Sequence, residues 1–294
     1  MHIVEKRRRL CYNSCVKYRA NKLFGSKSRV WEIDFLRGLA IIMMVLDHLA
    51  YDLSVLDSFV TPFNYLNGFL EGLRQFGIAI HNSTFRQVLH YFFAPLFLVL
   101  TGISTTFTKN KWRRLINMAL LSAFMTAVTT LIGRVSGMWC LILFGVLHCM
   151  TVGLTLVALI DLIPNESIAK YLSLGLGVVI IVVGILIPWY EAPVVSVSPF
   201  ENYFVGENFI TYLKIAVGVV RGGADCLGIF PCAGFVLVGN YLGKSFYAEK
   251  KSLLPQFDRP FNRIYCTIGR NTVWIYLLHQ VVIAGMVSML GIFN

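Results

Sequence analysis

Apolar residues along the chain fall into seven long runs separated by polar segments. Each run has roughly the 20 residues that an α-helix needs to cross the hydrocarbon core of a bilayer. The runs cover 35–56, 85–107, 115–133, 138–160, 171–190, 224–243 and 265–291. The pattern predicts an all-α fold: a polytopic membrane helix bundle with seven transmembrane helices.

An eighth apolar run, 209–220, is shorter than the others and contains Lys214. It fits a re-entrant helix, an interfacial helix or the first half of a tilted span, so the number of spans is seven or eight. Two other segments, 57–84 and 191–223, are long and lack a span-length apolar run. We expect them to be loops on the outer side, where binding sites are often built.

The first 34 residues form a basic arm ahead of the first apolar run. The arm is not a cleavable signal peptide, because the run that follows exceeds a signal h-region and no small-residue cleavage site ends it. We therefore expect two parts: a cytoplasmic arm over 1–34 and a transmembrane domain over 35–294.

Composition excludes a soluble protein. Hydrophobic residues make up 56% of the chain and charged residues 14%, whereas a soluble chain has about 25% charged residues. The net charge of +11 comes from 26 Lys and Arg against 15 Asp and Glu. Of these basic residues, 19 fall in segments on the side of the N-terminus and five on the opposite side. The positive-inside rule then predicts a multi-pass protein of the cell membrane with a cytoplasmic N-terminus. It also accounts for the charge without a nucleic-acid partner.

The first predicted helix carries an unusual number of ionisable residues. At 100° per residue, Asp34, Arg37, His48 and Asp52 share a stripe about 60° wide, while Asp47 lies to one side of it. In a purely structural interpretation, Asp34 caps the helix, the side chain of Arg37 extends toward the membrane interface, and His48 is a packing residue between helices. Because ionisable side chains are costly inside a bilayer, we favour a functional role for His48, with a carboxylate orienting its ring.

Other polar residues near the ends of predicted spans are weaker candidates. His81 precedes the second span, and His148 and His279 lie within spans, whereas His90 is interpreted as a packing residue. Asp225 follows two glycines where a span begins. No histidine or cysteine pair has metal-ligand spacing, so we expect no metal site.

A further candidate is the start of the last predicted span, where Arg270 and Asn271 follow a glycine. A cation beside backbone amides on the cytoplasmic side would suit the phosphates of a soluble cofactor.

Short motifs in fixed order resemble the heparan-α-glucosaminide N-acetyltransferase catalytic-domain family, within the transmembrane acyltransferases. They are WEIDFLRGLA at 31–40, VLDH at 45–48, FAPLF at 93–97, TGIS at 101–104, FGVLH at 144–148, GNYLG at 239–243, IGRN at 268–271 and YLLHQ at 276–280. The resemblance implies that cytosolic acetyl-CoA donates an acetyl group to a sugar or amino-sugar acceptor on the far side of the membrane.

The resemblance also implies two candidate catalytic histidines. Related acyltransferases use a histidine at the position of His48. The lysosomal enzyme has asparagine there and uses a histidine in the following loop, which an ungapped register places on His81. This sequence has both residues, so their division of labour stays open. We expect His48, His81 and Asp47 to be catalytic.

Supporting roles are then expected for Asp34, Asp52, His148, Asp225 and His279. The CoA-binding residues that we expect are Arg37, Arg113, Arg114, Arg270 and Asn271. The main alternative is a transporter or flippase for a small sugar or lipid-linked substrate, which would also use intramembrane histidine and arginine. Acceptor identity, N- versus O-acetylation and oligomeric state, including a homo-oligomer, stay open.

Overall fold

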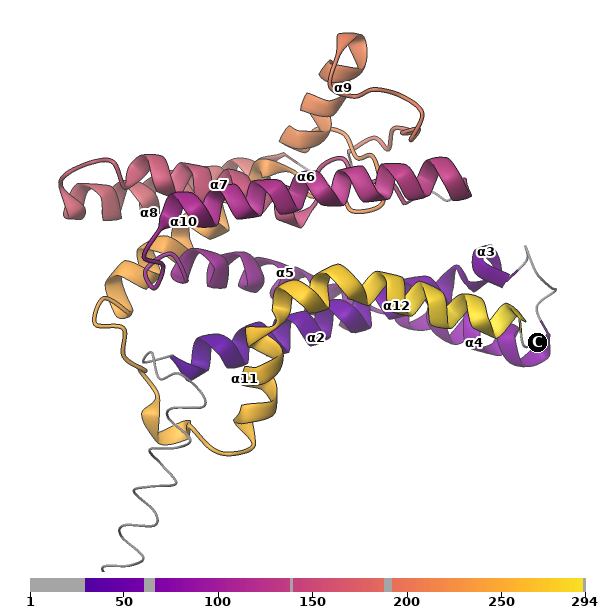
Figure 1. The fold of residues 1–294 in the computed structure, drawn as a ribbon, viewed down its shortest axis with the longest axis horizontal. Helices are drawn as coiled ribbons and strands as arrows, with labels where there is room; N and C mark the ends of the chain where they lie inside the picture. Colours follow the sequence, from indigo (N-terminus) through magenta and orange to yellow (C-terminus); the bar gives the residue numbers. More distant parts are fainter. Residues whose placement is uncertain (1–29, 61–66, 138–139, 188–191, 293–294) are drawn as a thin grey trace, which may run out of the picture.

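A computed structural model describes residues 30–60, 67–137, 140–187 and 192–292. Over these ranges the chain forms eleven α-helices and no strand beyond two isolated β-bridges, so the all-α prediction is confirmed. Most of the basic arm, 1–29, lies outside the described residues. Figure 1 shows the long helices running roughly parallel, in two groups.

Four helices are long and apolar enough to cross a membrane: α5 (Thr84–Ile103), α6 (Lys111–Ser136), α8 (Glu166–Leu186) and α12 (Thr272–Ile292). The helix α7 (Val146–Ile160) is apolar but shorter. The helices α2 (Trp31–Ser54) and α10 (Ile229–Phe246) have comparable length and contain polar residues. These helices make a helical membrane protein, while the number of spans and the side of the N-terminus remain predictions.

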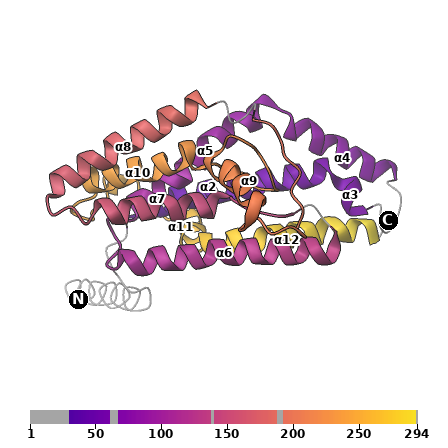
Figure 2. The ribbon, with the colours of Figure 1, turned by 90° about the horizontal axis from the view of Figure 1, so that it is seen from above.

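The helix α10 lies at the centre of one group and contacts α5, α7 and α8. Its contact with α5 is a close backbone approach: a Cβ atom on Gly102 would overlap the carbonyl of Val236, and one on Gly239 would overlap the carbonyl of Val99. Small residues of this kind let membrane helices pack tightly. Because α5 also contacts α2, it joins the two groups. Seen from above in Figure 2, α8 and α6 lie on opposite sides of α10 and α7.

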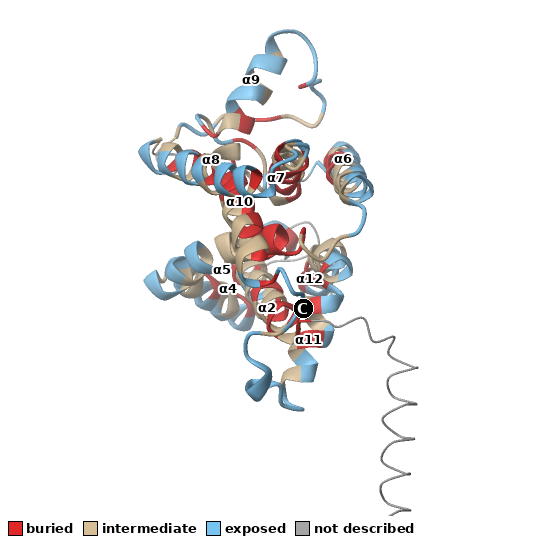
Figure 3. Ribbon diagram, turned by 90° about the vertical axis from the view of Figure 1, so that its left-hand side faces the viewer, coloured by how far each residue is buried: buried red, intermediate tan, exposed pale blue. Residues whose placement is uncertain are grey.

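Burial is concentrated between the two groups, and the outward faces are exposed (Figure 3). Those faces carry large apolar side chains, including Phe85, Val135 and Leu186, which are 74%, 81% and 74% exposed. A soluble protein would not present so much apolar surface, whereas lipid tails would cover it.

All seven predicted runs coincide with helices, but two helices begin later than predicted. The run 138–160 becomes helical only at Val146 and the run 224–243 only at Ile229. Residues 140–145 and 224–228 are not helical and pair with each other, because the amide of Leu227 donates to the carbonyl of Phe144 at 3.1 Å. Apolar composition alone does not distinguish such a paired segment from a helix.

The span predicted over 265–291 also begins later than expected, because the run is divided between two helices and its candidate span is Thr272–Leu290. The region forms α11 (Asn262–Arg270) and α12, separated at Asn271, and α11 crosses the direction of α12 in Figure 1. The helix α11 instead packs on α2 through glycines, since a Cβ atom on Gly269 would overlap the carbonyl of Asp34. This contact fixes the direction of α11 and separates it from α12.

The prediction that 57–84 is a loop is wrong. It contains α3 (Leu56–Val60) and α4 (Gly68–His81), and α4 packs against α2 at Gly77. The side chain of Asn67 caps α4 by accepting from the amide of Leu70 at 2.9 Å. This cap and the apolar periodicity that follows are signals that sequence reasoning could have used.

The short apolar run 209–220 corresponds to α9 (Gly206–Val217), which ends at Gly218 with a φ of 96°. Twelve residues of helix span about 18 Å, less than the hydrocarbon core. Part of the other expected loop is therefore helical.

Candidate active site

The polar residues of α2 face different neighbouring helices. Because α2 is unbroken from Trp31 to Ser54, consecutive residues point about 100° apart. Asp47 therefore meets α5, whereas His48 and Asp52 meet α12. At the inner end, Asp34 meets α11. One helix thus distributes polar groups to three partners.

Asp47 is held by two residues of α5. Arg86 donates to both carboxylate oxygens, with Nη2 at 3.0 Å from Oδ2, and Nδ1 of His90 lies 3.2 Å from Oδ2. Arg86 and His90 are four residues apart and share a helix face. Sequence reasoning singled out neither as functional, although this spacing within a predicted span was available as a signal.

His48 is oriented by the backbone and not by Asp47. Its Nδ1 lies 2.9 Å from the carbonyl oxygen of Met44. Since a carbonyl oxygen only accepts, Nδ1 must carry the proton, and Nε2 keeps a lone pair. His48 thus has the tautomer that can act as a base or nucleophile through Nε2.

His279 on α12 faces His48. Their ring centroids are 4.8 Å apart and the rings are nearly perpendicular, at 88°. Nδ1 of His279 donates to the carbonyl of Tyr276 at 2.7 Å. Its Nε2 is buried and has no hydrogen-bond partner among the described residues. Two imidazoles with available lone pairs therefore lie side by side.

Two carboxylates lie close to this histidine pair. Asp52, only 1% exposed, accepts from Nε2 of Gln280 at 2.8 Å, while Oε1 of Gln280 is buried without a partner in the described part of the chain. Asp225 accepts from the amide of Val146 at 3.3 Å, at the positive end of α7, and interacts electrostatically with His48. Sequence reasoning missed Gln280.

His81 ends α4 and packs against the ring of Tyr51, with a centroid distance of 5.4 Å. Tyr51 follows His48 by one turn of α2. Nδ1 of His81 is buried and lacks a partner within the described ranges, and the ring interacts electrostatically with Arg86 and Asp47. The structure therefore places His81 beside the site, next to Tyr51.

His148 is fully hydrogen-bonded. Its Nδ1 accepts from the amide of Gly145 at 3.2 Å, and Nε2 lies 3.1 Å from Oγ1 of Thr126, which donates to the carbonyl of Ile142. No lone pair remains on the imidazole for proton transfer. The arrangement fits a supporting role in which His148 ties α7 to α6.

At the inner end of α2, Asp34 lies between two arginines. Nη1 of Arg37 is 3.4 Å and Nε of Arg270 is 3.1 Å from its carboxylate. Arg37 also donates to Ser104, and Arg114 interacts electrostatically with Arg37. Three positive groups and one negative group leave a net charge of +2 in this cluster.

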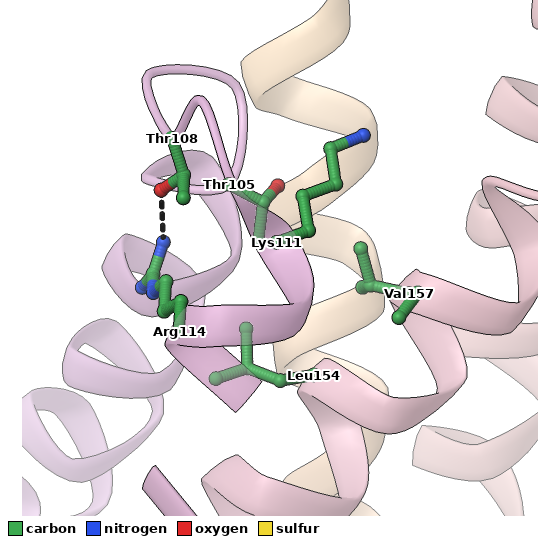
Figure 4. Close-up of a pocket in the computed structure, with 7 residues that line it drawn as sticks. Thr105, Thr108, Lys111, Arg114, Leu154 and Val157 are labelled. Atoms are coloured by element: carbon green, nitrogen blue, oxygen red, sulfur yellow. Dashed lines mark hydrogen bonds between the residues drawn. The ribbon is translucent and has the colours of Figure 1, made fainter. Parts of the chain in front are cut away.

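Arg114 is fixed by α5 and the segment after it. Nη1 donates to Oγ1 of Thr108 at 3.1 Å and Nη2 to the carbonyl of Thr101 at 2.9 Å, and Figure 4 shows the first bond beside a cavity of about 10 Å³, also lined by Lys111. That cavity has room for about one water molecule. These bonds therefore hold the guanidinium of Arg114 in a fixed position at the edge of the cluster.

Two of the predicted CoA-binding residues are not part of this cluster. Arg113 is exposed on α6, and the side chain of Asn271 donates to the carbonyl of Thr267 at 2.9 Å. Sequence reasoning also missed Asp161, which pairs with both Lys111 and Lys244 at the inner ends of α6 and α10. Among the described residues, no group of three His, Cys, Asp or Glu side chains could hold a metal ion.

Comparison with known proteins gives one finding. The family model described as "Heparan-alpha-glucosaminide N-acetyltransferase, catalytic" matches residues 29–76 and 65–281. Neither a curated protein nor a solved structure matches the chain. The matched ranges include the whole of α2 and the histidine and arginine clusters described above.

Proposed function

The chain belongs to the heparan-alpha-glucosaminide N-acetyltransferase catalytic family, and from this premise we propose that it acetylates a sugar or amino sugar across the cell membrane. Acetyl-CoA would be the donor, entering from the cytoplasmic side, where we expect the N-terminus. The acceptor would bind on the extracytoplasmic side. The family is one of membrane acetyltransferases, and the direction of transfer and the acceptor are our proposals.

The observation that carries this proposal is the polarity of α2. Arg37, Arg114 and Arg270 form a cationic cluster at one end of the helix, and His48 follows Arg37 by eleven residues. Eleven helical residues rise about 16 Å. Extended phosphopantetheine has a similar length, about 16–20 Å. Phosphates at the arginines would thus place the thioester near His48.

In the proposed reaction, Nε2 of His48 removes a proton from the acceptor amine or hydroxyl as that group attacks the thioester carbonyl. The C–S bond then breaks, and the CoA sulfur leaves as a thiolate that takes up a proton. The ring of His279 faces that of His48, with centroids 4.8 Å apart, and its own Nε2 would supply a second proton acceptor. The buried acceptors on His279 and Gln280 provide hydrogen-bond sites for the amine or hydroxyl of the incoming sugar.

His81 is the second candidate base, because its Nδ1 is also buried without a partner in the described part of the chain. Asp47 would act through Arg86 and His90 by fixing α5 against α2, and not by touching the substrate. Asp34, Asp52, His148 and Asp225 would position the groups that do.

The test compares His48→Ala and His81→Ala, assayed separately for acetyl-CoA turnover in detergent. His2→Ala, outside the residues that the family model matches, is the control. We expect a large loss in at least one of the two variants, which also identifies the primary histidine. Full activity in both variants would contradict the proposed mechanism. Thermal stabilisation by free sugars but not by CoA would favour a transporter instead.

A further inference from the structure

A groove of about 590 Å³ runs along the outer half of α6, separate from the cationic cluster and from His48. One wall is a face of α6 that includes Ser122, Ala127 and Thr130, and the opposite wall includes Phe204 and Tyr212 at α9. Figure 1 shows α9 projecting beside α6 and α7. The volume lies within the range of about 300–1,000 Å³ that is typical of sites for small ligands.

The groove exists because α6 has small side chains on this face. Ser122, Ala123, Thr126, Ala127 and Thr130 repeat at helical spacing and leave the space open, while Leu131 and Arg134 are the larger side chains of α6 that line it. Across it, the ring of Tyr212 is packed against those of Phe204 and Phe209, at centroid distances of 5.3 and 6.2 Å. Aromatic packing therefore holds the second wall in place.

The interior of the groove is apolar and one end is cationic. The hydroxyls of Ser122 and Thr130 donate to carbonyls of their own helix, at 2.9 and 2.6 Å, so they add little polarity. Arg134 lines the groove near the outer end of α6, and its Nε donates to the carbonyl of Pro199. Among the described residues, no carboxylate lies within salt-bridge distance of Arg134.

The length of the groove matches one leaflet of a bilayer. From Ser122 to Arg134 there are twelve residues, or about 18 Å of helix, and half of the hydrocarbon core is about 15 Å. We infer that the groove binds an anionic lipid, with a phosphate headgroup at Arg134 and one hydrocarbon chain along the small-residue face of α6. Charge complementarity at Arg134 and the mostly apolar walls together favour a lipid phosphate over a neutral lipid.

This lipid site and the candidate active site would both contact the first turn of α7. His148 forms part of the groove wall, and the same first turn of α7 holds Asp225 through the amide of Val146. The inference does not depend on the proposed reaction, because it rests on the walls of the groove and on Arg134.

The test measures thermal unfolding of the full chain in a neutral maltoside detergent, with dodecyl phosphate, dodecanol or inorganic phosphate as the added probe. We expect dodecyl phosphate to raise the melting temperature saturably, and the other two probes to have little effect. An equal response to dodecanol would show non-specific apolar binding, and an equal response to inorganic phosphate would show a free-anion site. Either result would overturn the inference.

Variants locate the response. Arg134→Gln should need at least about ten-fold more dodecyl phosphate, equivalent to about 1.4 kcal/mol. A123L/A127L, which fills the groove from two exposed positions, should lose the response while keeping the cation. Lys214→Gln removes an exposed cation from α9 and should respond as the unmodified chain does. An unchanged response in Arg134→Gln would overturn the inference.

Discussion

The two ends of α2 differ in how their polar groups are paired. At the N-terminal end, Asp34 accepts from both Arg37 and Arg270, and these residues with Arg114 are here called the inner cluster. Around the outer half, buried polar atoms of His81, His279 and Gln280 have no partner among the described residues. The three other such atoms are hydroxyl and amide groups on Thr106, just after α5, and on Asn240 and Ser245 of α10. None of those three is an imidazole that could take up a proton.

This difference indicates where substrate groups bind. Leaving a buried polar atom without a hydrogen-bond partner costs about 1–3 kcal/mol. Such atoms are therefore found where a ligand or a water molecule supplies the missing hydrogen bond. The inner cluster is shaped by its own ion pairs and retains positive charge for an anion. Within the described part of the chain, no donor reaches the unpaired acceptors of the outer region. The structure thus favours binding of the anionic donor at one end of α2 and chemistry at the other.

The largest effect that we expect is from His48→Ala. Removing a general base typically costs about 10²–10⁴-fold in rate, and we expect kcat to fall by this amount with KM for acetyl-CoA nearly unchanged. Steady-state kinetics at varied acetyl-CoA concentration would measure the split. A rise in KM without a fall in kcat would place His48 in donor binding and remove the contrast between the two ends.

Arg270→Gln should have the opposite signature. Losing one guanidinium from the inner cluster should raise KM for acetyl-CoA about ten-fold, or about 1.4 kcal/mol, with kcat little changed. The control is Arg263→Gln, an exposed arginine on the same helix, α11. Equal KM values for the two variants would contradict a specific role for Arg270.

Gln280→Ala tests the support beneath the histidine pair. It removes the donor to the buried carboxylate of Asp52, and we expect a loss of about 1–3 kcal/mol in the free energy of unfolding. Thermal or denaturant unfolding in detergent would measure the loss. The exposed Gln75 on α4 provides the matched control. If Gln75→Ala destabilised the protein as much, the Gln280 bond would have no special role.

The smallest effect should come from Arg113→Gln. Sequence reasoning placed Arg113 with the CoA phosphates, but its side chain is exposed on α6 outside the inner cluster. We expect a change of less than about two-fold in KM for acetyl-CoA, because exposed charges contribute little free energy to an ionic interaction. A loss as large as that of Arg270→Gln would extend the cationic cluster to α6.

Much of the fold could be predicted from sequence because apolar runs of span length report helices directly. The stripe on α2 was also predictable, since it needs only helical periodicity within one unbroken helix. The break at Asn271 was not, because it depends on Gly269 contacting the backbone of Asp34, a contact between residues far apart in the chain.

The same limit applies to the site. His48 and His279 were each visible as costly polar residues, but no local pattern shows that their rings meet. The partners of Asp47 were missed because Arg86 and His90 act as a pair only when α5 packs on that face of α2. Arg113 and Arg114 look equivalent in sequence, and only the packing of α6 separates the half-buried Arg114 from the exposed Arg113.

The central claim is that the donor binds at the cytoplasmic end of α2 and the acetyl group leaves at the other. It can be tested in sealed vesicles of known protein orientation, with labelled acetyl-CoA on one side and an amino-sugar acceptor on the other. The account predicts acetylated sugar only when acetyl-CoA is on the N-terminal side and the acceptor is on the opposite side. Product formed only when both substrates share one side would contradict it.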